Sequence, residues 1–197
     1  MPLTALTSTL GRKRAAHLLR RTCLAGSISE IDAFASLTPA QAVEQLFSET
    51  LPDPVLPIDP MTGVFAPQSE GFDLERYFLA WHLGQMLGNG IDAADKLSYI
   101  FRERLVYFMH THFTTKRAVV GNSRSLYYQQ ALFRLFAFDE TDIVLPPEDP
   151  EDPESMETIV PRNFKQLTKK LSVDNAMLVF LDGRFNVKGS PNENYAR

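Results

Sequence analysis

Apolar residues recur every three or four positions along most of the chain, a spacing that predicts amphipathic helices. Residues 9–24 place leucines on one side and basic residues on the other. The same spacing predicts helices over 72–87, 92–113, 123–137, 162–171 and 174–181. No stretch shows the alternation of a half-buried strand, so no β-sheet is expected. The predicted fold class is all-α (mainly helical), a multi-helix domain.

Capping signals mark the start of three more helices. Ser27 with Glu30, and Thr38 with Gln41, have the form of capping boxes, and they predict short helices ending near Ser36 and Ser48. Ser190 with Glu193 repeats this pattern and predicts a helix from Pro191. That helix would be cut at Arg197 before an apolar face develops. We therefore expect the chain to be truncated at its C-terminus, with residues 1–197 forming the N-terminal part of one helical domain.

Two proline-rich stretches interrupt the helical pattern. Residues 51–70 predict an extended connection, because prolines at this density exclude a helix. Residues 139–161 carry nine acidic residues and no Lys or Arg, and they predict an exposed acidic insertion. The alternative interpretation of this insertion is a segment that binds cations or a basic partner.

Charge is distributed unevenly, although the formal net charge is only −4. Residues 1–29 carry five basic residues and no acid, and we interpret them as a solvated helix face or as internal partners of carboxylates. No nucleic acid partner is expected, because the basic cluster is narrow and contains no interleaved aromatic residues. A protein partner stays open, and the oligomeric state is not predicted.

Cysteine content and hydropathy limit the kinds of protein that this chain can be. Cys23 is the single cysteine, which excludes an intrachain disulfide and favours a buried thiol. No apolar run approaches the length of a transmembrane segment. No export signal is recognised ahead of His17, which favours a cytoplasmic location.

His110 and His112 form the first candidate site. Histidine is a common metal ligand and general base. Residues two apart on a helix point to opposite faces, so the two side chains cannot bind one ion if both lie within the helix. His112 shares its predicted face with Phe101 and Phe108, which places it in the core. The alternative is that both histidines are structural, one in the core and one hydrogen-bonded near a helix end.

The segment from Asp182 to Glu193 is the second candidate. Asp182, Asn186, Ser190 and Glu193 occupy positions one, five, nine and twelve of a twelve-residue interval, as ligands do in a calcium loop. Arg184 and Val187 depart from that pattern at positions three and six. The alternatives are a turn followed by a helix cap, or a helix start that presents polar side chains to an anionic ligand.

Four strings together resemble the DUF1800 family of uncharacterised bacterial proteins. They are Ala16–Thr22 with Ile28–Ile31, Leu37–Val43, Arg104–Phe113, and Asp174–Leu178 continued by Leu181–Gly183 and Pro191–Arg197. The resemblance implies a longer natural protein, since family members continue into an acidic, leucine-rich helix. It also implies export, because many members are exported, and they occur beside a second uncharacterised, sulfatase-like family. It brings no established activity. The chain departs from the family at Met109, where Trp is usual, in the 139–161 insertion, and in lacking a recognisable export signal.

Two functions are compatible with these patterns. The first is a metal-assisted or hydrolase-like enzyme whose site joins the His110/His112 segment to residues 182–197, with a divalent metal as cofactor. The second is a non-catalytic helical scaffold or protein-interaction domain. For the first function we predict catalytic roles for His110, His112 and Glu193, binding roles for Asp182, Asn186, Asn192, Asn194 and Arg197, and metal ligands at His112, Asp182 and Glu193.

Overall fold

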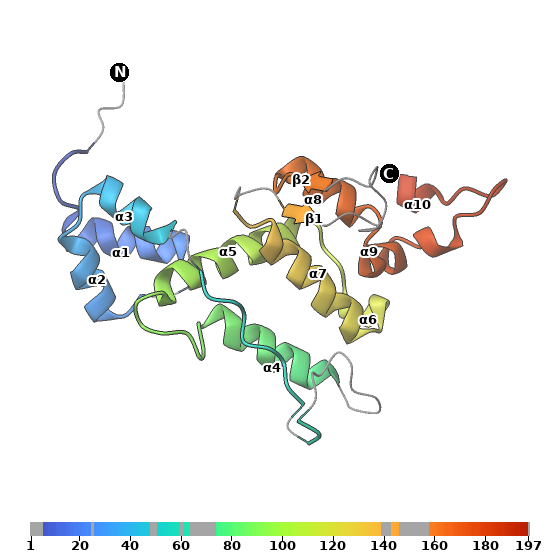
Figure 1. Ribbon diagram of the computed structural model, residues 1–197, viewed down its shortest axis with the longest axis horizontal. Coiled ribbons are helices and arrows are strands. Elements are labelled where there is room, and N and C mark those ends of the chain that lie inside the picture. Colours follow the sequence, from blue (N-terminus) through green and yellow to red (C-terminus); the bar gives the residue numbers. More distant parts are fainter. Residues whose placement is uncertain are drawn as a thin grey trace, which may run out of the picture. The chain divides into compact units, whose positions relative to one another are not determined.

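The computed structural model is mainly helical, as predicted, and it describes residues 6–24, 26–47, 51–59, 61–63, 74–138, 143–145 and 158–196 (Figure 1). The chain divides into two compact units, Met1–Leu105 and Val106–Arg197. Within the described residues, no helix is both long enough and apolar enough to cross a membrane.

The first unit contains α1 (Gly11–Thr22), α2 (Ile28–Ala35), α3 (Pro39–Leu46), α4 (Leu74–Met86) and the first turns of α5 (Lys96–His112). The predicted capping boxes are confirmed: Ser27 and Glu30 cap α2 reciprocally, and Thr38 and Gln41 cap α3. Helices α1 and α2 pack against each other (Figure 1). The largest fully buried side chains of this unit are Leu19, Phe34, Leu46 and Tyr99.

Side-chain hydrogen bonds join the extended connection and the helices of the first unit. The indole N–H of Trp81 donates to the Val55 carbonyl at 2.6 Å, which fixes α4 to the proline-rich connection. The Ser98 hydroxyl donates to the Gln45 carbonyl at 2.6 Å, so the start of α5 is held by the end of α3. Residues 51–59 contain no helix, as expected for this connection, whereas 64–70 lie outside the described residues.

The start of α5 differs from the prediction. We expected the helix to begin directly after Asp92, with Asp92 as its cap. Instead, Asp92 accepts the Asp95 amide through its backbone carbonyl in a turn, and the helix begins at Lys96. The sequence pattern therefore located the helix but placed its start too early, because the acidic residues form a turn of their own.

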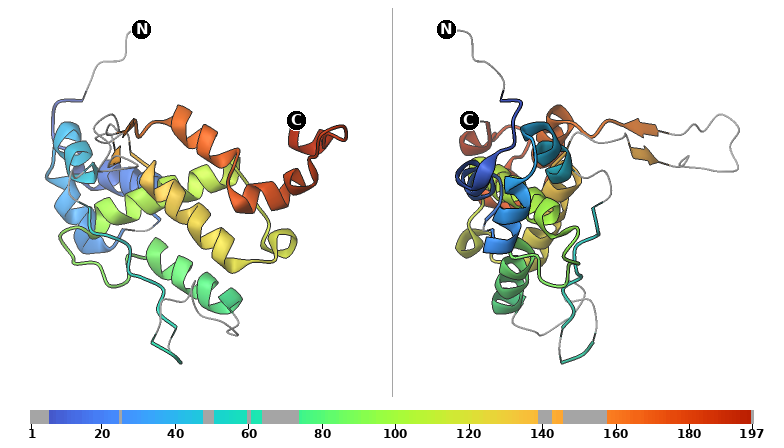
Figure 2. Two further views of the ribbon diagram at one scale, coloured as in Figure 1. Left: turned by 45° about the vertical axis from the view of Figure 1, so that its right-hand side comes forward. Right: turned by 90° about the vertical axis from the view of Figure 1, so that its left-hand side faces the viewer.

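The second unit contains the end of α5, α6 (Arg117–Val120), α7 (Ser123–Leu135), α8 (Phe164–Leu171), α9 (Asn175–Phe180), the 3-10 helix η2 (Gly183–Phe185) and α10 (Glu193–Ala196). Helices α6, α7 and α9 contact one another, and α8 lies beside α7 (Figure 2). The unit is held by an apolar cluster that combines α5, α7 and α8, made of Val106, Met109, Phe133, Phe136, Leu167 and Leu171.

A small sheet that we did not predict lies at the ends of the acidic insertion. Strand β1 (Ile143–Leu145) pairs antiparallel with β2 (Thr158–Val160), with Val144 opposite Ile159 (Figure 2). Both triplets are rich in β-branched residues, which favour strands, and they are too short to show an alternating pattern. The expectation of no sheet was therefore wrong here. Residues 139–142 and 146–157 of the predicted insertion lie outside the described residues.

Candidate functional site

His110 and His112 both lie within α5, so the geometric restriction derived from the sequence applies. His112 is exposed, which overturns its predicted place in the core. Its imidazole ring lies 4.2 Å from the ring of Phe108, which is itself 57 % exposed, and its Nδ1 lies 2.8 Å from the Phe108 carbonyl oxygen. Val106 and Met109 form the buried face at this end of α5, so the core-facing side differs from the predicted one.

His110 is the more buried of the two histidines. Its Nδ1 lies 3.2 Å from the side-chain nitrogen of Gln130, which places Gln130 as the donor and Nδ1 as the acceptor. Burial lowers the pKa of His110 from its ordinary value of 6.5, so the ring is neutral at physiological pH. Gln130 is only 3 % exposed, and its Oε1 has no hydrogen-bond partner in the described part of the chain.

Gln129 is the centre of a buried hydrogen-bond network beside His110. It is fully buried on α7, and its Oε1 accepts from the Thr115 hydroxyl at 2.7 Å. Its Nε2 donates to Asp174 Oδ1 at 2.8 Å, and the same oxygen accepts the Met177 amide at 2.9 Å. One glutamine thus connects the segment after α5 to the N-terminal cap of α9.

A second contact joins α7 to the start of α9. The Asn175 side-chain nitrogen donates to the Ser125 hydroxyl at 3.3 Å, and Ser125 is buried. Sequence reasoning selected none of these network residues as site residues. The sequence nevertheless indicates that Gln129 is buried, because it lies three residues after Leu126 and four before Phe133, on the apolar face of its helix. A polar residue at such a position needs buried partners.

The candidate segment 182–193 forms local turns in the structure. Asp182 has φ 58°, the left-handed conformation, and its carbonyl accepts the Phe185 amide at 3.0 Å. Asn186 Oδ1 accepts the Asn192 amide at 3.2 Å, which closes the loop on itself. The left-handed turn at Asp182 agrees with the alternative interpretation of this segment as a turn.

The cap of the last helix differs from the prediction. Asn192 Oδ1 accepts the Tyr195 amide at 3.1 Å, so Asn192 caps α10, which begins at Glu193. Ser190, the predicted cap, instead pairs with Val187 in an isolated bridge. The prediction was wrong because Asn192 lies one residue before the helix and is an equally good capping residue.

Tyr195 anchors α10 to the preceding helices. Its hydroxyl donates to the Ser172 carbonyl, and its ring lies against Gly183, where a Cβ atom would stand 2.7 Å from Tyr195 Cδ2. A larger residue at position 183 would therefore force the Tyr195 ring to shift. Gly183 and Tyr195, which both belong to the fourth family-like string, thus hold two parts of that string together.

No group of three or more His, Cys, Asp or Glu residues able to hold a metal occurs among the described side chains. Glu193 is exposed at the first position of α10. The side chain of Asn194 and the whole of Arg197 lie outside the described residues. The roles predicted for His110, His112, Asp182, Asn186, Asn192 and Glu193 stay predictions.

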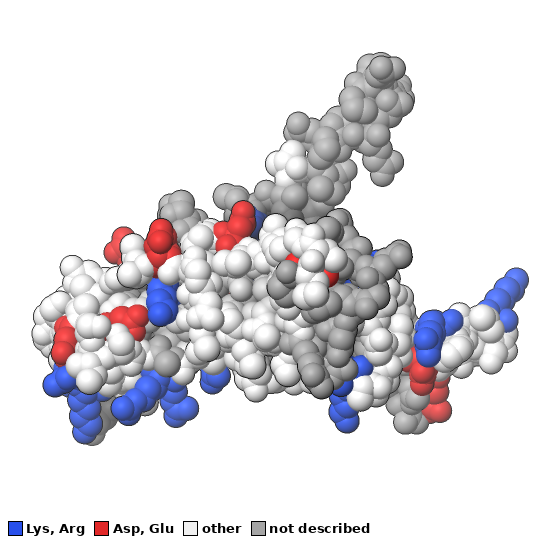
Figure 3. All heavy atoms as spheres, turned by 90° about the horizontal axis from the view of Figure 1, so that it is seen from below, with Lys and Arg blue, Asp and Glu red and all other residues white. Residues whose placement is uncertain are grey.

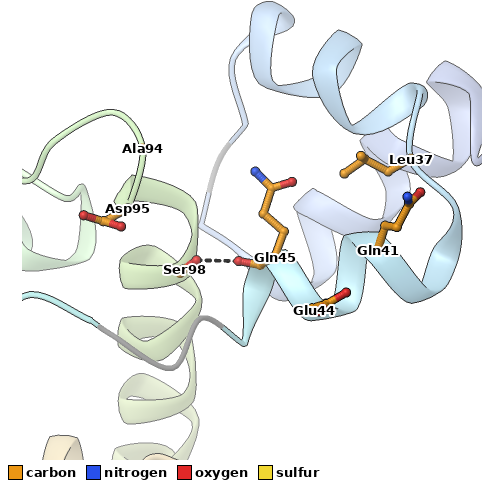
Figure 4. A pocket seen from close by; sticks show the side chains of 7 residues that line it. All are labelled: Leu37, Gln41, Glu44, Gln45, Ala94, Asp95 and Ser98. Carbon is orange, nitrogen blue, oxygen red and sulfur yellow. Dashed lines mark hydrogen bonds between the residues drawn. The ribbon is translucent and has the colours of Figure 1, made fainter.

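The first unit contains a surface pocket lined by several polar residues. It measures about 390 Å³ and lies between α3 and the start of α5. Figure 4 shows Glu44 and Asp95 on different elements with their side chains pointing apart, and Ser98 bonded to the Gln45 carbonyl. Gln41 also lines the pocket, but its side-chain oxygen accepts from Thr38 in the capping box of α3. The polar groups of this pocket do not converge on a common point.

Comparison with known families gives one match that spans most of the chain. The family model described as "Protein of unknown function (DUF1800)" matches residues 17–197. No curated protein and no solved structure matches the chain. The matched residues include Thr115, Gln129 and Asp174 of the buried network.

Proposed function

The chain belongs to the DUF1800 family, and from that premise we propose that it is a helical scaffold that acts by binding another protein. The observation that carries the proposal is the network around Gln129. Thr115 follows one family-like string and Asp174 begins another, and Gln129 connects them by two hydrogen bonds. Buried hydrogen-bond networks whose donors and acceptors are paired make helix packing rigid and specific.

The polar groups of the second candidate segment support the same function. Asn192 caps α10, and Asn186 closes the loop before it. Tyr195 binds the Ser172 carbonyl, which fixes the last helix. These side chains are used in folding contacts, so the segment serves as a structural closure for the second unit.

Exposed leucines on and just after α4 support a role in binding. Leu79, Leu83 and Leu87 follow one another at intervals of four residues, and each is at least 50 % exposed. Side chains at this spacing lie on one face of a helix, and such rows bind the apolar face of a helix from a partner. A scaffold that binds proteins would use this kind of surface.

Metal analysis of the purified full-length protein tests the proposal. We expect less than about a tenth of an equivalent of Zn, Mn, Fe or Ni after dialysis, and no change in melting temperature on adding a chelator, because no protein-stabilising metal would be lost. Wild type and His110→Ala should give the same metal content. A stoichiometric transition metal that disappears in His110→Ala would refute the scaffold function.

A second candidate function is the metal-assisted or hydrolase-like enzyme predicted from the sequence. The observation that favours it is Gln130, whose buried Oε1 has no hydrogen-bond partner among the described residues and lies on the side chain that bonds the neutral ring of His110. Such a group can hold a water molecule or a small donor next to a base. Under this function, the predicted roles of His110, His112, Asp182 and Glu193 would apply, and the same metal analysis would reveal them.

A further inference from the structure

Helix α1 presents a strongly cationic face to solvent. Lys13, Arg14, His17, Arg20 and Arg21 are all exposed, and they share one side of the helix at intervals of three, four and seven residues. The opposite side buries Ala15 and Leu19. Figure 3 shows Lys and Arg side chains gathered along one edge of the first unit. We call these five side chains the α1 cationic face.

Ion pairing within the unit does not neutralise this face. Arg12, which lies at its border, pairs with Asp32 at 2.9 Å, and both side chains are more than half exposed. In the described residues, none of the five members of the α1 cationic face forms an ion pair. The positive charges of the Lys and Arg members are therefore available to a partner.

A surface hollow adjoins the face. It measures about 770 Å³, within the range of ligand-binding clefts. Arg12, Lys13, Arg14 and His17 line it together with Leu10 and Leu18, so basic and apolar side chains share its lining. This combination favours a ligand that carries negative charges next to an apolar group.

We propose that the α1 cationic face binds an acidic peptide segment of a partner protein, with one apolar side chain of that segment in the hollow. The inference rests on the proposed scaffold function and names the chemistry of the partner. From Lys13 to Arg21 the helix rises about 12 Å, which equals about four residues of extended peptide. Each carboxylate would receive a charge-assisted hydrogen bond from Arg or Lys.

A peptide fits these observations better than a lipid surface or a nucleic acid does. The apolar side of α1 is buried, so the helix has no apolar face to insert into a bilayer. A nucleic acid requires a wider basic footprint, and single strands also require aromatic residues for stacking, which the face does not contain. The hollow accepts a protruding side chain, which neither a flat headgroup layer nor a phosphate backbone provides.

Fluorescence anisotropy with a labelled peptide of glutamates around one leucine tests the proposal. The double variant Arg14→Gln/Arg21→Gln removes two charges from the face. The control Arg124→Gln/Lys169→Gln removes two charges from exposed positions elsewhere, so both proteins have the same net charge. We expect binding that weakens with salt and falls about tenfold in the first variant only. A peptide of glutamines around the same leucine should not bind.

The remaining outcomes separate this inference from the scaffold function. Equal weakening in both variants would show nonspecific attraction and would overturn the proposal. Binding of phosphatidylglycerol vesicles or of duplex DNA through the same face, without binding of the peptide, would also overturn it. If no probe binds, the inference fails, while the scaffold function still depends only on the metal analysis. Unchanged melting temperatures would show that both variants fold.

Discussion

The buried face of α7 and the exposed face of α1 use polar side chains in opposite ways. Gln129 on α7 is fully buried, and its amide pairs with both Thr115 and Asp174. The five members of the α1 cationic face are exposed, and within the described chain they form no ion pair. Buried polar groups must find partners inside the protein, whereas exposed ones remain free for partners outside it. The polar side chains of the first face therefore stabilise the fold, whereas the second is the face for which we propose a partner.

Gln129→Ala tests whether the buried network of α7 stabilises the fold, and it should have the largest effect. The change leaves the Thr115 hydroxyl without its acceptor and Asp174 without its side-chain donor, and it opens a cavity in a fully buried position. We expect a loss of about 3 kcal/mol in the free energy of unfolding, measured with urea. Gln45→Ala, at an exposed position, should change it by less than about 0.5 kcal/mol. Equal effects of the two changes would show that the network does not stabilise the fold.

Gly183→Ala tests the closure of the last segment. The added Cβ would stand 2.7 Å from Tyr195 Cδ2 and 2.9 Å from Leu178 Cδ2, so the tyrosine ring must move. We expect a destabilisation of about 2 kcal/mol, typical of overpacking. In a Tyr195→Ala background the same change should cost less, which a double-mutant cycle measures. Additive effects would show that the ring and the glycine do not interact.

Asp174→Ala separates the network from simple capping. Asp174 caps α9 and also accepts from Gln129, whereas Asn163 caps α8 through the Gln166 amide. Loss of a cap costs about 1 kcal/mol. Asp174→Ala should therefore destabilise by about 1 kcal/mol more than Asn163→Ala, because it also breaks the bond to α7. Chemical denaturation of both variants gives the difference, and equal losses would limit Asp174 to capping.

Short sequence patterns predicted the helices and their caps better than they predicted the buried network and the faces of the candidate histidines. The capping boxes at Ser27 and Thr38 are confirmed, because four consecutive residues contain all the groups that form them. The buried network could not be predicted in the same way, since Gln129 and Asp174 are far apart in sequence and only packing brings them together. The faces of His110 and His112 were assigned from one stripe of α5, but the core contacts a different side near its end.

Acidification should lower the free energy of unfolding through the partly buried ring of His110. Burial lowers the pKa of His110 below its ordinary value of 6.5, so the unfolded chain binds a proton more readily than the folded one. Stability from this group is therefore complete above pH 6.5 and falls as the pH drops from 6.5 through the lowered pKa. Urea unfolding between pH 7.5 and 5 should show this decline for the wild type. His110→Gln should flatten it, because the group with the lowered pKa is then absent. A decline that persists in His110→Gln would assign it to other groups.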